Sequence, residues 1–204
     1  MNSFPVTAMR YGISLIGPQL WSGALPDLAV AGPNVGSNLH LAVHFSGTVG
    51  AAVYASRVAG IPSIAFSGAS TGTLPFDTNP VPLRSRLYAQ LATQLVNTLT
   101  IQGKPYLPQD VWLNVNFPEV SEECSDARQF KWVLSRINVG LFSQPDVRIC
   151  GGEKLPTETE VVGTEGCWVS VSVGDARDKT TVDRERQAVV VGRLGGLLSC
   201  LPSS

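Results

Sequence analysis

The chain has 204 residues, of which 44% are hydrophobic and 15% are charged. This length and composition suit one domain with a buried core and exclude a disordered chain. The net charge of −1, from 15 basic and 16 acidic residues, argues against a general binder of nucleic-acid polymers or membrane surfaces. No apolar run reaches the ~20 residues that span a bilayer, so we expect small-molecule chemistry and no membrane partner.

The first half of the chain alternates between predicted helices and predicted strands. Helical periodicity predicts three helices, at residues 5–16, 46–60 and 83–100. Ser3 is the expected cap of the first helix, and Gly17 is its expected end. Short apolar runs predict three buried strands, at residues 27–31, 61–66 and 111–115. This alternation predicts an α/β fold with a mainly parallel sheet and helices on both faces.

From Glu119 onward the pattern changes. Apolar runs between polar loops predict three further strands, at residues 130–138, 147–150 and 168–173. The period-two alternation of the last run predicts a half-exposed antiparallel strand. A terminal helix is expected at about 183–198. We therefore expect a single domain over 1–204, composed of an α/β core part at 1–118, an antiparallel β-rich extension at 119–182 and a terminal helix segment at 183–204.

All four cysteines lie in the second half of the chain: Cys124, Cys150, Cys167 and Cys200. They form no CxxC pair and lie far from the two histidines, which argues against a zinc site. The sequence permits two disulfides in any of three connectivities, or four buried thiols. The N-terminus lacks the basic start and apolar stretch of a secretory signal, so a cytosolic protein is expected if Met1 is the true start.

Two loops lie where a parallel sheet places its ligands, at the carboxyl ends of strands. The loop Gly32–Asn38 has glycines that allow close approach of a ligand and asparagines that offer neutral oxygens to a hard cation. The segment Phe45–Gly50 opens a predicted helix, with the hydroxyls of Ser46 and Thr48 beside free N–H groups. The second segment is either a phosphate cradle or an ordinary turn with a helix cap.

His40 and His44 lie between these two loops and are four residues apart. On a helix they would share a face and could bind a metal, whereas in a loop they need not meet. Because no third ligand is in view, we favour surface or packing histidines.

Pro26–Ala52 reads PDLAVAGPNVGSN…FSGTVGAA, which resembles the signature of the SurE-like metal-dependent phosphatases and nucleotidases. The resemblance continues through Gly60–Ser67, through LNVNFP at Leu113–Pro118 and through EGCWVSV at Glu165–Val171. The start SFPVTA, the cysteines and the SCLP near the C-terminus resemble the fungal branch of secreted acid phosphatases.

The resemblance implies a Rossmann-like hydrolase that removes phosphate from nucleoside monophosphates and related monoesters with a divalent cation, Mg²⁺ or Mn²⁺. Asn34 matches the asparagine that helps to hold the metal. The residues that match the phosphate-side loop or shape its pocket are Ser46, Gly47, Thr48, Gly36 and Asn38. The resemblance also implies secretion and a homodimer or tetramer, formed through elements exchanged within 121–182.

Two departures from the family pattern bear on activity. His40 stands where the family has glycine, and no Asp-Asp pair occurs in the 204 residues, although the family begins with a strand ending in NDDG that supplies the principal metal ligands. The resemblance thus implies that the first strand–helix units are missing, that the catalytic aspartates are absent, and that a sheet edge and apolar helix faces are exposed.

Three hypotheses follow from this pattern. The chain is a phosphatase domain with impaired activity, a non-catalytic remnant used for interaction or dimerisation, or a phosphate- or nucleotide-binding domain without hydrolysis.

Overall fold

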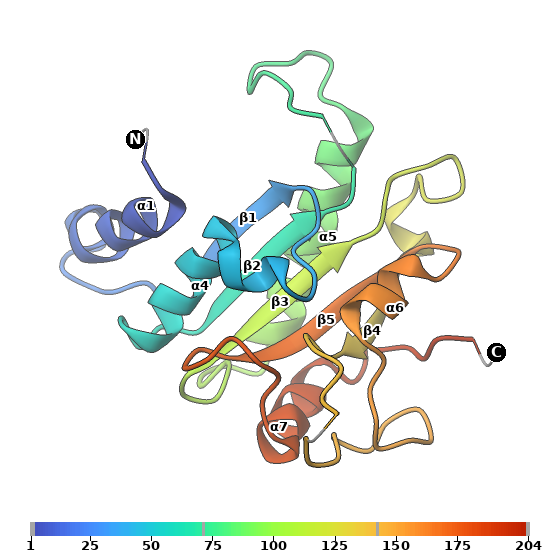
Figure 1. The fold of residues 1–204 in the computed structure, drawn as a ribbon. Helices are drawn as coiled ribbons and strands as arrows, with labels where there is room; N and C mark the ends of the chain where they lie inside the picture. The colour runs from blue at the N-terminus through green and yellow to red at the C-terminus, as the bar shows by residue number, and fades with distance from the viewer. Residues whose placement is uncertain (1–2, 71, 142, 203–204) are drawn as a thin grey trace.

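A computed structural model describes residues 3–70, 72–141 and 143–202. In this part of the chain, one five-stranded sheet has the order β1-β2-β3-β5-β4 (Figure 1). The strands are β1 (Ala29–Val35), β2 (Ser63–Gly68), β3 (Val111–Phe117), β4 (Lys131–Ser135) and β5 (Trp168–Asp175). β1, β2 and β3 are parallel, β5 is antiparallel to β3, and β4 is parallel to β5. The predicted mainly parallel sheet is confirmed, and the β-rich segment belongs to this same sheet.

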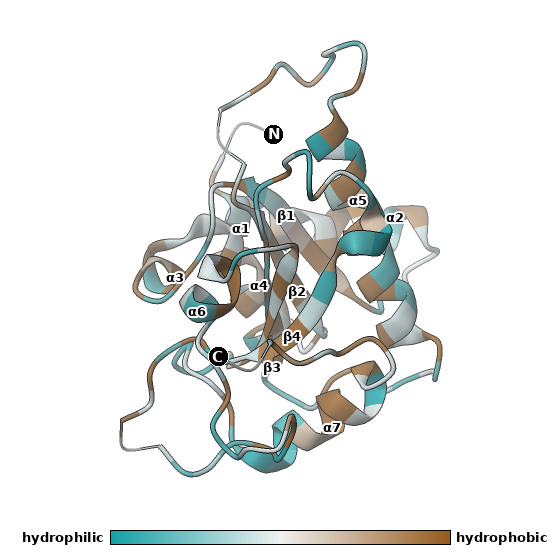
Figure 2. Cartoon of the chain, turned by 90° about the vertical axis from the view of Figure 1, so that its right-hand side faces the viewer, coloured by the Kyte–Doolittle hydropathy of each residue, from teal (hydrophilic) through white to brown (hydrophobic). Residues whose placement is uncertain are grey.

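Helices cover both faces of the sheet, as predicted (Figure 2). On one face, α4 (Gly47–Arg57) packs on Ala65 and Trp112. On the other face, α5 (Leu83–Thr100) and α7 (Arg184–Leu194) enclose the main core with Ile64 and Phe66. The remaining helices are α1 (Pro5–Tyr11), a π-helical turn η1 (Gly12–Ile16), α2 (Gly17–Leu20), α3 (Ala42–Phe45), a 3₁₀ turn η2 (Ala127–Gln129) and α6 (Glu158–Gly163).

The longest helix, α5, has the predicted bounds. Four leucines recur on it at intervals of four, so they share one face. All four are buried: Leu87, Leu91, Leu95 and Leu99. No helix in the described ranges, α5 included, is long and apolar enough to cross a membrane.

The first helical segment differs from its prediction at both ends. Phe4 occupies the cap position of α1 with no side-chain cap hydrogen bond, so the expected cap by Ser3 is wrong. Gly17 does not end the helix, because it has right-handed helical dihedrals and the chain continues through η1 into α2. A Cβ at Gly17 would lie 2.6 Å from the Trp21 ring, so this glycine permits close packing instead of termination.

Two strand predictions in the second half are corrected. Residues 147–150 form no strand, because the N–H of Val147 donates to the side chain of Gln187 and the chain turns at Cys150, whose φ is +55°. β5 is buried on both faces and not half-exposed, since it lies between β3 and β4 under α6 and α7. Ser170 and Ser172 of β5 were expected to face solvent, but they are buried in a polar layer.

β1 forms one edge of the sheet, and apolar side chains near it are exposed. They include Val30 and Val35 on the strand itself and Leu15, Leu20 and Trp21 on the helical segment that precedes it. The expected exposure of a sheet edge and of apolar helix faces is therefore present.

The four cysteines form two disulfides, Cys124–Cys167 and Cys150–Cys200, which settles the alternatives left open by the sequence. The second disulfide ties the turn at Cys150 to the C-terminal segment. The neighbouring Ser199 N–H donates to the carbonyl of Trp132 on the edge strand β4. The C-terminal segment thus covers the edge of the sheet opposite β1.

We predict that replacing Cys150 and Cys200 together by alanine lowers the free energy of unfolding by about 4 kcal/mol, because the closed loop spans 50 residues. Urea denaturation of the oxidised proteins measures the change. The matched control, Cys124 and Cys167 replaced together, removes a 43-residue loop and should cost a similar amount. A cost well under 1 kcal/mol for both pairs would contradict the prediction.

Candidate functional site

β1 contains a bulge at Gly32 and Pro33. The pairing of β1 with β2 shifts by one residue there, from Ala31 opposite Ala65 to Asn34 opposite Ser67. Such an extra residue re-aims the side chains that follow it. Gly32 has φ +101°, and a Cβ on it would lie 2.2 Å from the carbonyl oxygen of Phe66. Only glycine fits this bulge, which places Asn34 at the carboxyl end of the sheet.

Asn34 is held by its own loop. Its amide nitrogen donates to the carbonyls of Val35 (3.1 Å) and Gly36 (2.9 Å). The N–H of Gly36 in turn donates to the carbonyl of Gly68, at the end of β2. The amide nitrogen of Asn34 is therefore occupied as a donor within the loop, and Oδ1 is the atom that is left to accept a hydrogen bond or to bind a cation.

The start of α4 lies on the same edge of the sheet as Asn34. The hydroxyl of Ser46 accepts from the N–H of Val49 (3.2 Å) and is the N-cap of the helix. The N–H groups of Gly47 and Thr48 lack intrahelical acceptors by helix geometry. Gly47 is exposed, although a Cβ there would lie 3.1 Å from the Pro5 ring of α1. Ser46 thus forms the helix cap that was one of the two alternatives for this segment, and the donors beside it suit an anion.

A cavity of about 700 Å³ joins these elements. It lies between α1–α2, β1 and the first turn of α4, and both Asn34 and Thr48 line it. Thr48 is buried with 9% of its surface exposed. The structure therefore brings the predicted metal asparagine and one predicted phosphate-side hydroxyl to one cavity, whereas Ser46 and Gly47 lie outside its lining.

Asn38 anchors the loop Gly32–Asn38 to the sheet and is buried. Its N–H donates to Oδ1 of Asn116 (2.8 Å), and its amide nitrogen donates to the hydroxyl of Ser67. Its carbonyl accepts from the side chains of Asn114 (2.9 Å) and Asn116 (3.2 Å). Four hydrogen bonds from two strands thus fix the far end of the loop.

Glu158, the first residue of α6, extends this polar layer and has no exposed surface. Its Oε1 accepts from the amide of Asn114 (2.7 Å), whereas Oε2 and Oδ1 of Asn114 lack partners among the described residues. Burial raises the pKa of Glu158 to about 8, and the hydrogen bond from Asn114 offsets part of that rise. The raised pKa favours the protonated carboxyl, which avoids a buried charge.

The described residues do not fit a divalent metal by themselves. A hard cation needs several oxygen ligands, mostly anionic, and Asn34 Oδ1 is one neutral oxygen. Within the described ranges, no three His, Cys, Asp or Glu side chains are grouped to hold an ion. His40 precedes α3 with φ +46°, His44 lies within α3, and both are exposed, as expected of surface histidines.

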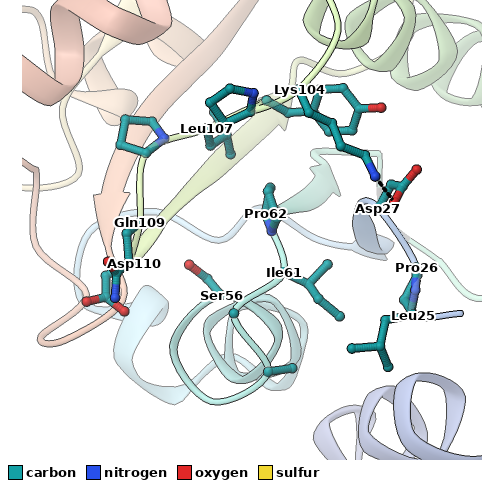
Figure 3. Close-up of a pocket in the computed structure, with 15 residues that line it drawn as sticks. Leu25, Pro26, Asp27, Ser56, Ile61, Pro62, Lys104, Leu107, Gln109 and Asp110 are labelled. Carbon is teal, nitrogen blue, oxygen red and sulfur yellow. Dashed lines mark hydrogen bonds and ion pairs between the residues drawn. The ribbon is translucent and has the colours of Figure 1, made fainter.

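A second cavity, of about 650 Å³, lies at the opposite ends of the strands (Figure 3). Asp27, Pro62 and Asp110 precede β1, β2 and β3 there, and an ion pair between Lys104 and Asp27 closes one side. Ligands of parallel sheets gather at the carboxyl ends of strands. The Asn34–Thr48 cavity runs along the whole of β1, and its end at Asn34 and Thr48 is therefore the candidate site.

Comparison with known proteins gives the family. Residues 1–140 match the family described as survival protein SurE. The chain belongs to the SurE family.

Several known proteins resemble the chain. It is 32% identical over 198 residues to an acid phosphatase of Yarrowia lipolytica, covering 83% of this chain and 55% of that protein. It is 37% identical over 121 residues to the 5'-nucleotidase SurE of Deinococcus radiodurans, covering 59% of this chain and 38% of that protein. The SurE protein of Aquifex aeolicus has the same fold, with a TM-score of 0.59 at 24% identity over 86% of this chain and 68% of that one. The chain thus spans about half the length of the curated relatives or less.

Within this SurE-family chain, sequence reasoning assigned no role to Glu158, Asn114 or Asn116. The LNVNFP run carries the signal for the two asparagines, since they alternate with apolar residues in a strand that is buried throughout. No comparable signal marks Glu158, which lies in a capping segment (Thr157–Glu160) of a kind that usually faces solvent.

We predict that Gly32→Ala destabilises the protein by more than about 2 kcal/mol, because the positive φ and the contact with the Phe66 carbonyl both oppose a Cβ. Gly36→Ala is the matched control: Gly36 has φ +94° but nothing within 4 Å of its Cβ position, so only the backbone cost of about 1 kcal/mol applies. Thermal and urea denaturation measure both changes. Equal costs at the two positions would contradict the close approach.

We predict that Glu158→Gln flattens the pH dependence of stability. The ordinary pKa is 4.5 and the folded value is about 8, so the folded state binds more protons between these values. The free energy of unfolding contributed by Glu158 is fully present below about pH 4.5 and declines as the pH rises to about 8. The glutamine variant cannot ionise and should lose that decline.

Urea denaturation at several pH values between about 5 and 8 measures this effect. Glu160→Gln, in the same helix, is the control, since hydrogen bonds from Thr157 lower the pKa of Glu160 and it contributes no such decline. An unchanged slope in Glu158→Gln would show that the buried carboxyl is already ionised.

Proposed function

We propose that this chain provides the phosphate-holding part of a phosphomonoester hydrolase, acting on nucleoside monophosphates and related monoesters. One observation carries the proposal: Asn34 and Thr48 line the same cavity, which runs along β1 and reaches the carboxyl end of the strand beside the start of α4. The names of the relatives, acid phosphatase and 5'-nucleotidase, support the same chemistry.

The residues of the chain suit anion binding. The N–H groups of Gly47 and Thr48 and the positive end of the α4 dipole favour a phosphate, and the Thr48 hydroxyl adds a donor. Ser46 keeps the helix start in place through its cap. Hydrogen bonds from the N–H groups of Gly36 and Asn38 fix the loop Gly32–Asn38 to the sheet. This loop is therefore a preformed wall for the bound ester.

We propose that hydrolysis of the phosphomonoester requires a divalent cation, Mg²⁺ or Mn²⁺. Asn34 Oδ1 would contribute one ligand, and carboxylate ligands have to come from elsewhere. When bound, such an ion polarises the phosphoryl group and activates water. Because the described residues do not form that site, we assign no catalytic step to this chain.

The second candidate function is phosphate binding, or an interaction or dimerisation role, without hydrolysis. It is favoured by the lack, within the described ranges, of a metal-ligating group of His, Cys, Asp or Glu. We further propose secretion, supported by the two disulfides, which persist in oxidising compartments. A homodimer or tetramer formed through residues 121–182 also remains a proposal.

We predict that the purified 204-residue chain binds inorganic phosphate but shows little or no release of phosphate from a nucleoside monophosphate, with or without Mg²⁺ or Mn²⁺. Isothermal titration and a colorimetric phosphate assay measure the two properties. Thr48→Val should weaken phosphate binding about tenfold, the value of one hydrogen bond to a charged group. Thr93→Val, which removes an exposed hydroxyl on α5, is the control.

Two results would contradict this proposal. Unchanged phosphate binding in Thr48→Val would show that the Thr48 hydroxyl does not bind the phosphate. Robust metal-dependent turnover that Asn34→Ala abolishes would show that the chain assembles a complete metal site.

A further inference from the structure

Polar side chains form a buried layer on the face of the sheet that carries Trp112. Side chains of a strand alternate between its two faces, so Asn114 and Asn116 of β3 lie on the same face as Trp112. Ser172 and Ser170 of β5 stand opposite these two asparagines in the register. All four polar side chains are buried, and α6 packs over this part of β3, β4 and β5.

Glu158, at the start of α6, is the acidic member of this layer and has no exposed surface. Its N–H donates to the carbonyl of Arg136 (3.0 Å), which fixes the start of the helix against the end of β4. The amide nitrogen of Asn114 donates both to Oε1 of Glu158 (2.7 Å) and to the carbonyl of Asn38 (2.9 Å). One amide group therefore connects the buried carboxyl to the loop Gly32–Asn38.

The hydrogen bonds of this pair lack one donor. Oε2 of Glu158 and Oδ1 of Asn114 are both buried and find no donor among the described residues. The Ser170 hydroxyl is also without a partner there, so it does not reach either oxygen. An ionised carboxylate offers acceptors only, whereas a protonated carboxyl has one O–H donor. A proton on Oε2 can satisfy both oxygens at once, which removes the cost of two unpaired buried acceptors.

The surroundings of the carboxyl favour its neutral form. The side chains that β3, β4 and β5 contribute to the layer are amides and hydroxyls, and the guanidinium of Arg136 is paired with Asp146 (2.9 Å). His40 comes near through its main chain, with its ring exposed, and Glu160 accepts hydrogen bonds from the residue that caps α6. Burial therefore raises the pKa of Glu158 to about 8.

We propose that Glu158 is a positioning residue of the candidate site: its carboxyl carries a proton, donates it to Oδ1 of Asn114, and so holds the loop Gly32–Asn38 in place. When this proton leaves to solvent, two acceptors face each other and the Asn114 amide turns away. Asn38 then loses one of its four hydrogen bonds, and the loop that contains Asn34 is less fixed. The use of this loop in phosphate binding rests on the proposed function, whereas the proton and the pairing do not.

The first test observes the proton and the loop directly in the full chain. Infrared spectroscopy with isotope-labelled glutamate carboxyls should show the C=O band of a protonated carboxyl at about pH 6, and the band should disappear with a midpoint near pH 8. Glu158→Gln should abolish this band. The NMR resonance of the Asn38 N–H should shift with the same midpoint in the wild type and stay constant in Glu158→Gln, because the glutamine amide can donate to Asn114 in place of the acid.

The second test measures the affinity for inorganic phosphate between about pH 6 and pH 9. The titration of phosphate itself is common to all variants, so the ratio of affinities isolates the effect of Glu158. We expect the wild type to lose about two- to tenfold relative to Glu158→Gln as the pH rises, the value of one hydrogen bond. Glu158→Ala lacks the pair and should bind weakly already at pH 6. Glu185→Gln, which removes an exposed carboxylate on α7, should follow the wild type.

Three results would overturn the inference: no Glu158 band at about pH 6, an Asn38 resonance that does not change across the midpoint of the band, or the same pH dependence of phosphate affinity in the wild type and Glu158→Gln. This last result would keep the proposed function. If phosphate binds at no pH, the proposed function fails, and the band and the Asn38 shift still establish that Glu158 positions the loop. If Glu158→Ala does not fold, the comparison with Glu158→Gln still decides.

Discussion

The position of the candidate site depends on the hydrogen bonds that hold Asn38 to the middle of the sheet. Two asparagines on β3 and a serine on β2 are buried where a parallel sheet normally places apolar side chains. Burying them costs free energy unless each polar group finds a partner, and the backbone and amide of Asn38 supply most of those partners. The loop therefore cannot shift without leaving polar atoms unsatisfied, which fixes the segment that contains Asn34.

The divergence of α4 and α5 to opposite faces of the sheet explains why functional features concentrate at the end of β1. The start of α4 presents N–H groups on one side of Asn34, and the loop before α5 presents apolar side chains on the other. The bulge at Gly32 makes this division possible, because it sets the direction of Asn34 at the boundary.

The sequence predicts the parts of the structure in which one local pattern decides the outcome. The four leucines of α5 give its bounds, and the Pro26–Ala52 motif identifies the loops that share the Asn34–Thr48 cavity. The antiparallel strand β5 was predicted, but its predicted half-exposure was wrong, because period-two alternation was taken to mean one solvent face, whereas Ser172 pairs with Ser135 inside the protein (2.8 Å). The burial of Glu158 could not be predicted, since it depends on how α6 docks on β3 and β5.

Both disulfides lie within residues 124–200, and the segment that contains the candidate site has none. A cross-link removes conformations from the unfolded chain only between its two ends. The disulfides therefore restrict the unfolded chain only in the half that contains β4 and β5, whereas α1, α2 and β1 depend on packing and hydrogen bonds alone.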